Sequence, residues 1–123
     1  MFDAERVREL ANADFEFTNA ARFWDATIRI EFGPSPYLLE LRGGRIERFE
    51  PDRSAGSRWD LRIAAPSEGW AEFLKPVPKA FFHDLFAAMW RENFTVEGGV
   101  FSWGPYYPAL RRFFEIMRGA GSR

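Results

Sequence analysis

Residues 24–32 alternate between apolar and polar side chains, and this is the clearest strand pattern in the chain. The apolar positions are Trp24, Ala26, Ile28, Ile30 and Phe32, and the positions between them are Asp25, Thr27, Arg29 and Glu31. Because successive side chains of a strand point to opposite faces, the pattern predicts one buried and one solvated face. A chain built around such a strand needs a sheet that is covered on one side only.

Turn signals divide the following residues into further strands. Gly33 to Pro36 ends the first strand, and Tyr37, Leu39 and Leu41 form a second inward row. Gly43-Gly44 predicts a tight hairpin, because both turn positions favour positive φ. The return strand, residues 45–50, alternates poorly, which indicates an edge strand or a bulge. Trp59, Leu61 and Ile63 predict a fourth strand.

Helical spacing appears at both ends of the strand region. Residues 1–13 contain a helix that Asp3 can cap, and we expect it to pack peripherally. Two helices are expected within residues 66–91, the second from about Lys79 to Arg91. A short strand, residues 94–97, precedes a last helix over 105–118. With the strands at 22–64, this order predicts a single domain over residues 1–123, with one mainly antiparallel sheet and helices on one face.

The chain is rich in aromatic residues and poor in catalytic ones. Aromatic residues make up 18% of it, whereas it has no cysteine and one histidine, His83. Large rings fill cores or line pockets for apolar ligands. Asp84 follows His83 directly, but neighbours on a helix point about 100° apart, so the two do not form a natural dyad. The composition predicts a binding protein without metal or other cofactor rather than an enzyme.

Charge and hydropathy exclude other classes of partner. A formal net charge of −1 without a basic run argues against nucleic-acid binding. No apolar run approaches the roughly 18 residues of a spanning helix, so stable membrane insertion is not expected. The absence of cysteine and of a signal-peptide pattern favours a cytoplasmic location.

Three sequence segments resemble the sterol carrier protein 2 (SCP2) family. They are residues 36–46 (strand, Gly-Gly hairpin and return strand), residues 59–63 leading into the helix at 67–74, and residues 94–99 before the final helix. The resemblance covers residues 22–118, and Gly99 departs from the Asp often found at that position. It implies an α/β (α+β) fold with a five-stranded, mainly antiparallel sheet that helices cover on one face.

The resemblance also implies a function. Members of the family bind fatty acids, acyl-CoAs or sterols in an apolar tunnel between sheet and helices, and the domain alone has no catalytic residues. They often work beside enzymes of lipid oxidation, so a partner enzyme of lipid metabolism is expected. Since the targeting tail of eukaryotic members is missing, the chain resembles a bacterial version.

The aromatic rows of the late helices supply the candidate ligand-binding residues. If these helices close imperfectly on the sheet, a lined cavity remains. The predicted lining consists of Trp24, Phe82, Leu85, Phe86, Met89, Trp90, Trp103, Tyr106, Tyr107 and Leu110.

Several polar residues have two interpretations. The tyrosine hydroxyls are expected either to meet a ligand's polar end or to be structural, and His83 to lie at a helix rim or near a ligand head group. Arg111, Arg112 and Arg118 form a strip on the outer side of the last helix, either solvated or facing an anionic group. Asp25, Glu31 and Asp60 are expected to be solvated rather than an acid–base pair.

Two other functions stay open at this stage. One is a small isomerase or hydratase acting on a hydrophobic ring substrate, although such folds usually end in a curved sheet and this chain ends in a helix. The other is a non-catalytic subunit of a lipid- or steroid-degrading complex, with the aromatic surface as its interface. Neither the oligomeric state nor the identity of the ligand follows from the sequence.

Overall fold

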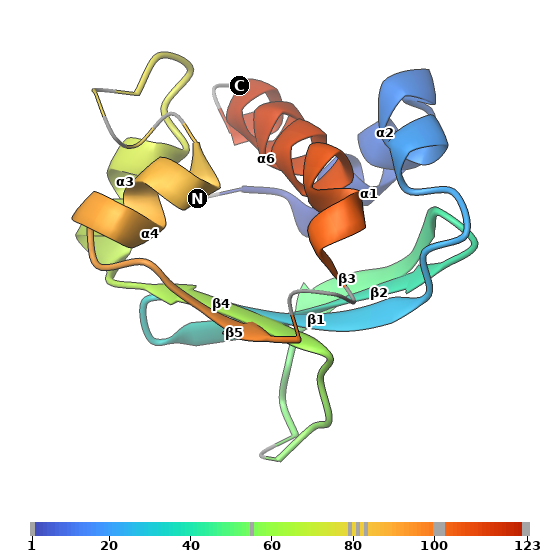
Figure 1. Ribbon diagram of the computed structural model, residues 1–123, viewed down its shortest axis with the longest axis horizontal. Helices are drawn as coiled ribbons and strands as arrows, with labels where there is room; N and C mark the ends of the chain where they lie inside the picture. The colour runs from blue at the N-terminus through green and yellow to red at the C-terminus, as the bar shows by residue number, and fades with distance from the viewer. Residues whose placement is uncertain are drawn as a thin grey trace.

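The central strand of the molecule is β1 (Ala26–Phe32), which carries the alternating pattern. Figure 1 shows the computed structural model. It describes residues 2–54, 56–78, 80, 82, 84–99 and 103–121, except the side chains of residues 86, 90, 91 and 121. Every second residue of β1 is buried, from Ala26 to Phe32, and those between are partly exposed. The expected strand therefore forms, beginning at Ala26 rather than at residue 22.

Five strands make up the sheet within the described residues, in the order β3-β2-β1-β4-β5. The others are β2 (Ser35–Arg42), β3 (Arg45–Pro51), β4 (Leu61–Ala65) and β5 (Thr95–Gly98). Three of the pairings are antiparallel, and β1 pairs with β4 in parallel. The expected α+β architecture, with a mainly antiparallel sheet, is confirmed. The fourth strand was predicted to include Trp59 as an inward residue. This is wrong, because Trp59 precedes β4 and is 37% exposed.

The β2–β3 hairpin combines a glycine turn with an irregular edge. Gly43 and Gly44 both have positive φ, 57° and 81°, as the turn requires. A Cβ on Gly44 would also lie 2.9 Å from the Cα of Arg22, so the chain passes too closely there for a side chain. The register shifts between Glu40 and Leu41, and β3 is an edge strand. The poor alternation of β3 thus has both of the predicted causes, an edge position and a bulge.

All the helices of the described residues cover one face of the sheet (Figure 1). They are α1 (Ala4–Asn12), α2 (Phe15–Ala20), α3 (Ser67–Phe73), α4 (Leu85–Arg91), the 3₁₀ turn η1 (Gly104–Tyr106) and α6 (Tyr107–Gly121). Asp3 caps α1 as expected, through its contact with the backbone N–H of Arg6 at 3.2 Å. Helix α2, which Asp14 caps, was not expected from the sequence pattern. Helix α4 begins at Leu85, after Asp84 in an extended conformation, so the helix expected from about Lys79 is shorter than predicted; residues 79, 81 and 83 lie outside the described residues.

Helix α1 lies over the outermost strand β3. The side-chain amide of Asn12 donates to the carbonyl of Ile46 at 3.0 Å, and its oxygen accepts from the N–H of Ile46 at 2.8 Å. An exposed strand edge can pair with another chain, so this contact protects the edge at Ile46.

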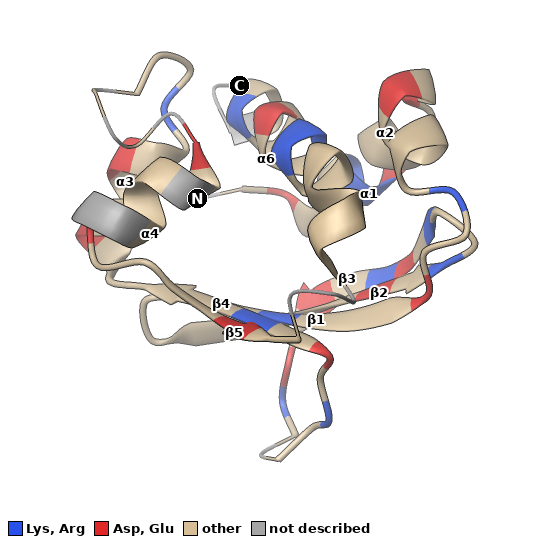
Figure 2. Ribbon diagram, viewed as in Figure 1, with Lys and Arg blue, Asp and Glu red and all other residues tan. Residues whose placement is uncertain are grey.

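The opposite face of the sheet carries paired charges. Glu31, 22% exposed, accepts from Arg29 at 2.8 Å and from Arg62 at 2.8 and 3.0 Å. Arg62 also pairs with Glu97, and Figure 2 shows basic and acidic segments side by side where β4 and β5 meet. Arg29 reaches Asp52, whose contacts with Ser54 and Ser57 hold the loop below the sheet. Glu31 therefore lies on the outward face as expected and is partly exposed, but two guanidinium groups hold its carboxylate.

Acid should weaken this charge network through Glu31. Hydrogen bonds from Arg62, and then from Arg29, lower the pKa of Glu31 from its usual 4.5 to about 2. Because the pKa is lower in the folded state, Glu31 stabilises the protein above pH 4.5, and this contribution is lost as the pH falls toward 2. We expect Glu31→Gln to lower the urea midpoint at pH 7. Near pH 2 the urea midpoints of the variant and the parent protein should become equal. Glu47→Gln, at an exposed site on β3, is the control; a gap independent of pH would contradict this account.

Candidate ligand-binding site

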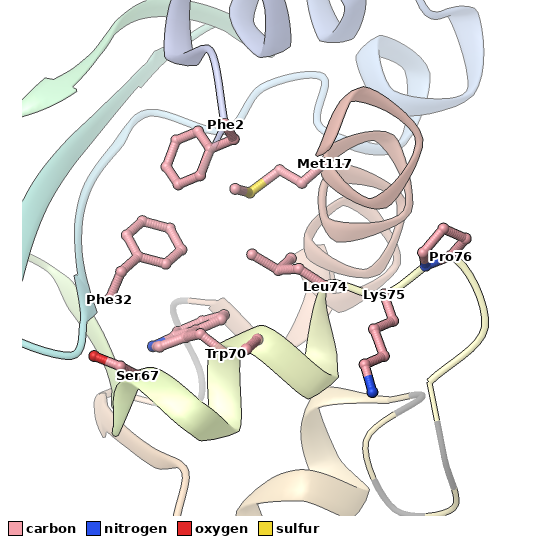
Figure 3. A pocket seen from close by; sticks show the side chains of 9 residues that line it. Phe2, Phe32, Ser67, Trp70, Leu74, Lys75, Pro76 and Met117 are labelled. Atoms are coloured by element: carbon pink, nitrogen blue, oxygen red, sulfur yellow. The ribbon is translucent and has the colours of Figure 1, made fainter. Parts of the chain in front are cut away.

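An apolar pocket of about 310 Å³ lies where β1 ends, between the start of the chain, α3 and the C-terminal half of α6 (Figure 3). Its walls are mostly aromatic and aliphatic: Phe2, Phe32, Trp70, Ala71, Leu74 and Met117. Figure 3 shows Phe2, Phe32, Leu74 and Met117 converging on one space, with the Trp70 indole forming one of its walls. Apolar walls with a few polar groups at the rim are typical of small-molecule pockets.

Trp70 is the most firmly fixed wall of the pocket. It is 2% exposed, and its indole Nε1 donates to the backbone carbonyl of Glu31 at 2.7 Å. Its ring lies 4.7 Å from Phe32 and 4.9 Å from Phe94. Pro66 begins α3 directly after β4, and Gly69 lets this helix approach, because a Cβ there would lie 3.3 Å from the Phe94 ring. The buried indole therefore has a partner for its only polar atom, as such a group needs.

Phe2 brings the start of the chain into the same site. Its ring lies 5.0 Å from Phe32, 5.3 Å from Tyr37 and 5.7 Å from Phe49. The Phe49 contact is stacked, with 5° between the planes. One wall of the pocket is thus held by ring packing.

The polar groups of the pocket lie at its rim. Lys75, 57% exposed, forms an ion pair with Glu72 at 2.8 Å. In Figure 3 its ammonium group points away from the apolar side chains, and Ser67 lies at the other side. The pair is exposed on the side of Lys75 only, because the Glu72 side chain is 15% exposed.

Arg118 of α6 connects the end of α3 with the segment before α4. Its guanidinium donates to the carbonyls of Phe73 at 2.8 Å and Phe82 at 3.1 Å, and lies 4.7 Å from the centre of the Phe73 ring. Burial lowers the pKa of Arg118 below its usual range. Arg112 is engaged elsewhere, with Asp14 at 2.8 Å, while Arg111 is exposed. The prediction that the three arginines form one strip on the outer side of the last helix is therefore wrong, because Arg118 is directed inward.

The predicted lining residues are divided among several places. Trp24, Trp103 and Tyr106 meet at a second hollow, at the beginning of β1. The Tyr107 hydroxyl donates to the Asp84 carboxylate. Phe82, Leu85 and Leu110 belong to the buried core, and Met89 is partly buried and packs against it. The side chains of Phe86 and Trp90, and all of His83, lie outside the described residues.

The middle of the space between sheet and helices is filled. Ile30, Ile63 and Phe113 are each fully buried there. Phe114 and Trp70 pack beside them, with ring centres 5.7 Å apart. Among the described rings of the late helices, Phe113 and Phe114 belong to the buried core, and the hollows lie at the ends of β1.

The carboxylates of Asp25 and Asp60 accept hydrogen bonds from the backbone of neighbouring strands and turns. Asp25 accepts from the N–H of Gly43 at 2.7 Å, and Asp60 accepts from that of Thr27 at 2.8 Å. Among the described residues no group of three His, Cys, Asp or Glu side chains can hold a metal ion. In the same part of the chain, no helix is long and apolar enough to cross a membrane.

Comparison of the structure identifies the fold. No protein-family model and no curated protein matches the sequence. A crystal structure of sterol carrier protein 2 superposes with a TM-score of 0.76 at 16% identity, over 95% of this chain and 94% of the other. The chain has the SCP2 fold.

Two other solved structures share this fold. A conserved hypothetical protein from Thermus thermophilus, described as possibly a sterol carrier protein, has a TM-score of 0.70 at 16% identity, over 98% of this chain and 89% of that one. The UbiJ-SCP2 ubiquinone synthesis protein has a TM-score of 0.60 at 9% identity, over 93% of this chain and 90% of its own. The resemblance inferred from the sequence is therefore confirmed at the level of the fold.

Sequence reasoning missed most walls of the pocket in this SCP2 fold. The predicted lining included none of Phe32, Trp70, Leu74 and Met117, and only Phe32 was placed, as a buried position of the first strand. Their signal was the spacing of Trp70 and Leu74, one turn apart at the end of the strand region. Phe2 carries no periodic pattern, so nothing in the sequence placed it.

The hydrogen bond of Trp70 should be measurable in the stability of the protein. Trp70→Phe removes the donor to Glu31 and part of a buried ring, so we expect a loss of about 1–3 kcal/mol in the free energy of unfolding. Trp59→Phe, the same change at a partly exposed site, should cost less than about 0.5 kcal/mol. Urea denaturation compares the two, and equal losses would show that Trp70 does not anchor the wall.

Proposed function

We propose that this protein binds the hydrocarbon chain of an apolar small molecule in the pocket beside Trp70 and carries it without chemical change. The observation that supports this most directly is the convergence of apolar side chains on an open space. Each methylene group that leaves water contributes about 0.8 kcal/mol. The entropic cost of ordering the ligand reduces this gain. A pocket with mostly apolar walls is suited to reversible binding.

The size of the pocket favours a single linear chain among the ligands expected from the sequence. Its volume of about 310 Å³ is at the low end of the roughly 300–1,000 Å³ of small-molecule pockets. A fatty acid or the acyl part of an acyl-CoA is narrow and flexible, whereas a sterol is a rigid block of fused rings. We therefore propose an acyl chain as the preferred cargo and a sterol as the weaker ligand.

Lys75 suggests how the polar end of the ligand is held. It lies at the rim with its ammonium group outside the apolar space, which is the place for a carboxylate whose chain lies inside. The exposed end of its pair with Glu72 is the lysine, whose ammonium group can turn toward a ligand carboxylate at the rim. We propose that Lys75 favours an anionic over a neutral head group.

The context of this binding remains a prediction. We propose a non-enzymatic carrier that delivers its cargo to an enzyme of lipid metabolism in a bacterial cytoplasm. The structural neighbour named as a ubiquinone synthesis protein makes an isoprenoid chain a second type of cargo to test.

Filling the pocket should abolish binding without unfolding the protein. Ala71 is an exposed residue of the pocket wall, so Ala71→Trp places a large ring at the opening with little effect on the core. We expect the affinity of the delipidated protein for dodecanoate, measured by calorimetry, to fall at least about tenfold. Ala71→Ser is the size-matched control. Undiminished binding by Ala71→Trp, or no binding of any chain by the parent protein, would refute the proposed site.

The contribution of Lys75 can be separated from that of the apolar walls. Lys75→Gln should weaken dodecanoate binding about two- to fivefold, the range of an exposed ion pair, and leave dodecanol binding unchanged. Arg111→Gln, which removes a charge from an exposed site on α6, should change neither affinity. An equal loss for acid and alcohol would show that Lys75 acts through packing and not through charge.

A further inference from the structure

A second hollow, of about 350 Å³, lies at the opposite end of β1 from the apolar pocket. Four aromatic residues and two carboxylates line it: Phe23, Trp24, Trp103, Tyr106, Asp25 and Asp60. The proposed carrier function makes no use of this place. Its combination of rings and acidic groups differs from the almost entirely apolar walls beside Trp70.

Three of the rings form a fixed wall. Trp24 is buried, and its ring lies parallel to that of Tyr106, with 4.8 Å between the centres and 5° between the planes. Trp103 is also buried, and its Nε1 contacts the carbonyl of Gly98 at 3.4 Å. These rings are held by the fold before any ligand binds, which lowers the entropic cost of binding.

Phe23 lies at the rim in a conformation that the fold alone does not explain. It has a φ of 72°, in the left-handed region, which costs free energy for any residue with a Cβ. Its ring is 82% exposed, so it gains little from burial. Glycine would make the same turn after α2 without strain. The exposed side chain of Phe23 is therefore accessible to a ligand at the rim.

The two carboxylates have no cationic partner among the described residues. Each accepts one backbone N–H, from Gly43 for Asp25 and from Thr27 for Asp60. Across that part of the chain no Lys or Arg side chain lies within ion-pair distance of either, whereas arginines pair with acidic groups elsewhere. Arg22 lines an adjacent hollow, and its guanidinium lies 6.0 Å from the Phe23 ring.

We propose that this hollow binds a small organic cation, an alkylated ammonium group. Aromatic faces attract such a cation and replace its weakly held water, as they do in quaternary-ammonium sites. Asp25 and Asp60 supply the opposite charge at short range. The two features act on the same ligand, since the rings take its alkyl groups and the carboxylates its charge.

The chemistry of the walls argues against an inorganic ion. A metal ion needs several hard oxygen or nitrogen ligands, and rings offer none. Within the part of the chain that the structure describes, no third His, Cys, Asp or Glu completes a metal cluster. A cation with an apolar surface fits this lining better than a hydrated one.

Choline and its neutral carbon isostere, 3,3-dimethylbutan-1-ol, test the proposal. The two have nearly the same shape and differ in charge. Titrations followed by the indole N–H signals in two-dimensional NMR should show choline binding about tenfold or more tightly than the alcohol. The double variant Asp25→Asn, Asp60→Asn keeps the acceptors for the two backbone N–H groups and should lose most of this difference. Glu47→Gln is the charge control and should bind like the parent protein.

The variant Phe23→Gly tests whether the ring at the rim contributes to choline binding without destabilising the fold. It removes the ring and relieves the positive φ, so the urea midpoint should not fall, while choline binding weakens several-fold. Equal affinities for choline and the alcohol, or no binding of choline by the folded parent protein, would overturn the proposal. Because Ala71→Trp closes only the other pocket, it should leave choline binding intact, which distinguishes failure here from failure of the carrier function.

Discussion

The structure depends on the division of β1 into a buried and a charged face. Ile28 and Ile30 are fully buried, and Arg29 and Glu31 form ion pairs on the other side. A strand in the middle of a sheet cannot exchange these faces, because a slip of one residue would bury both charges. The helices must therefore cover the same face (Figure 1). Their packing leaves hollows at the ends of β1, while Phe113 and its neighbours fill the centre.

The hollows at the two ends differ because different parts of the chain close them. At the end with Phe32, the closing residues are Trp70 and Leu74 of the α3 segment and Met117 of α6, which are apolar. At the other end, Trp24, Tyr106 and the two aspartates come from turns and from the residues just before a strand. Helix faces that meet a sheet are apolar by necessity, whereas turns tolerate charge. The two ends of one sheet thus have hollows with different linings.

The sequence predicted the parts of the fold that depend on local pattern. The alternation of β1, the Gly43-Gly44 turn and the Asp3 cap each follow from the preferences of a few neighbouring residues, and each is present. The pocket was not predicted, because periodicity shows which face is buried but not whether a buried side chain meets another side chain or a space. Leu110 and Met117 have the same helical pattern, yet only Met117 lines the pocket. Phe2 reaches the site through a chain path that no local pattern encodes.

Glu31 joins the two faces of the sheet. Its carboxylate lies between Arg29 and Arg62 on the charged face, and its carbonyl accepts from the Trp70 indole on the covered face. The wall formed by Trp70 is thus held by a hydrogen bond to a central strand that pairs with β2 and β4 and carries ion pairs on its other face. Phe2, on the other side of the pocket, is held by ring contacts from a segment at the start of the chain. The pocket is thus bounded on one side by a wall with a hydrogen-bonded anchor and on the other by a ring that only packing holds.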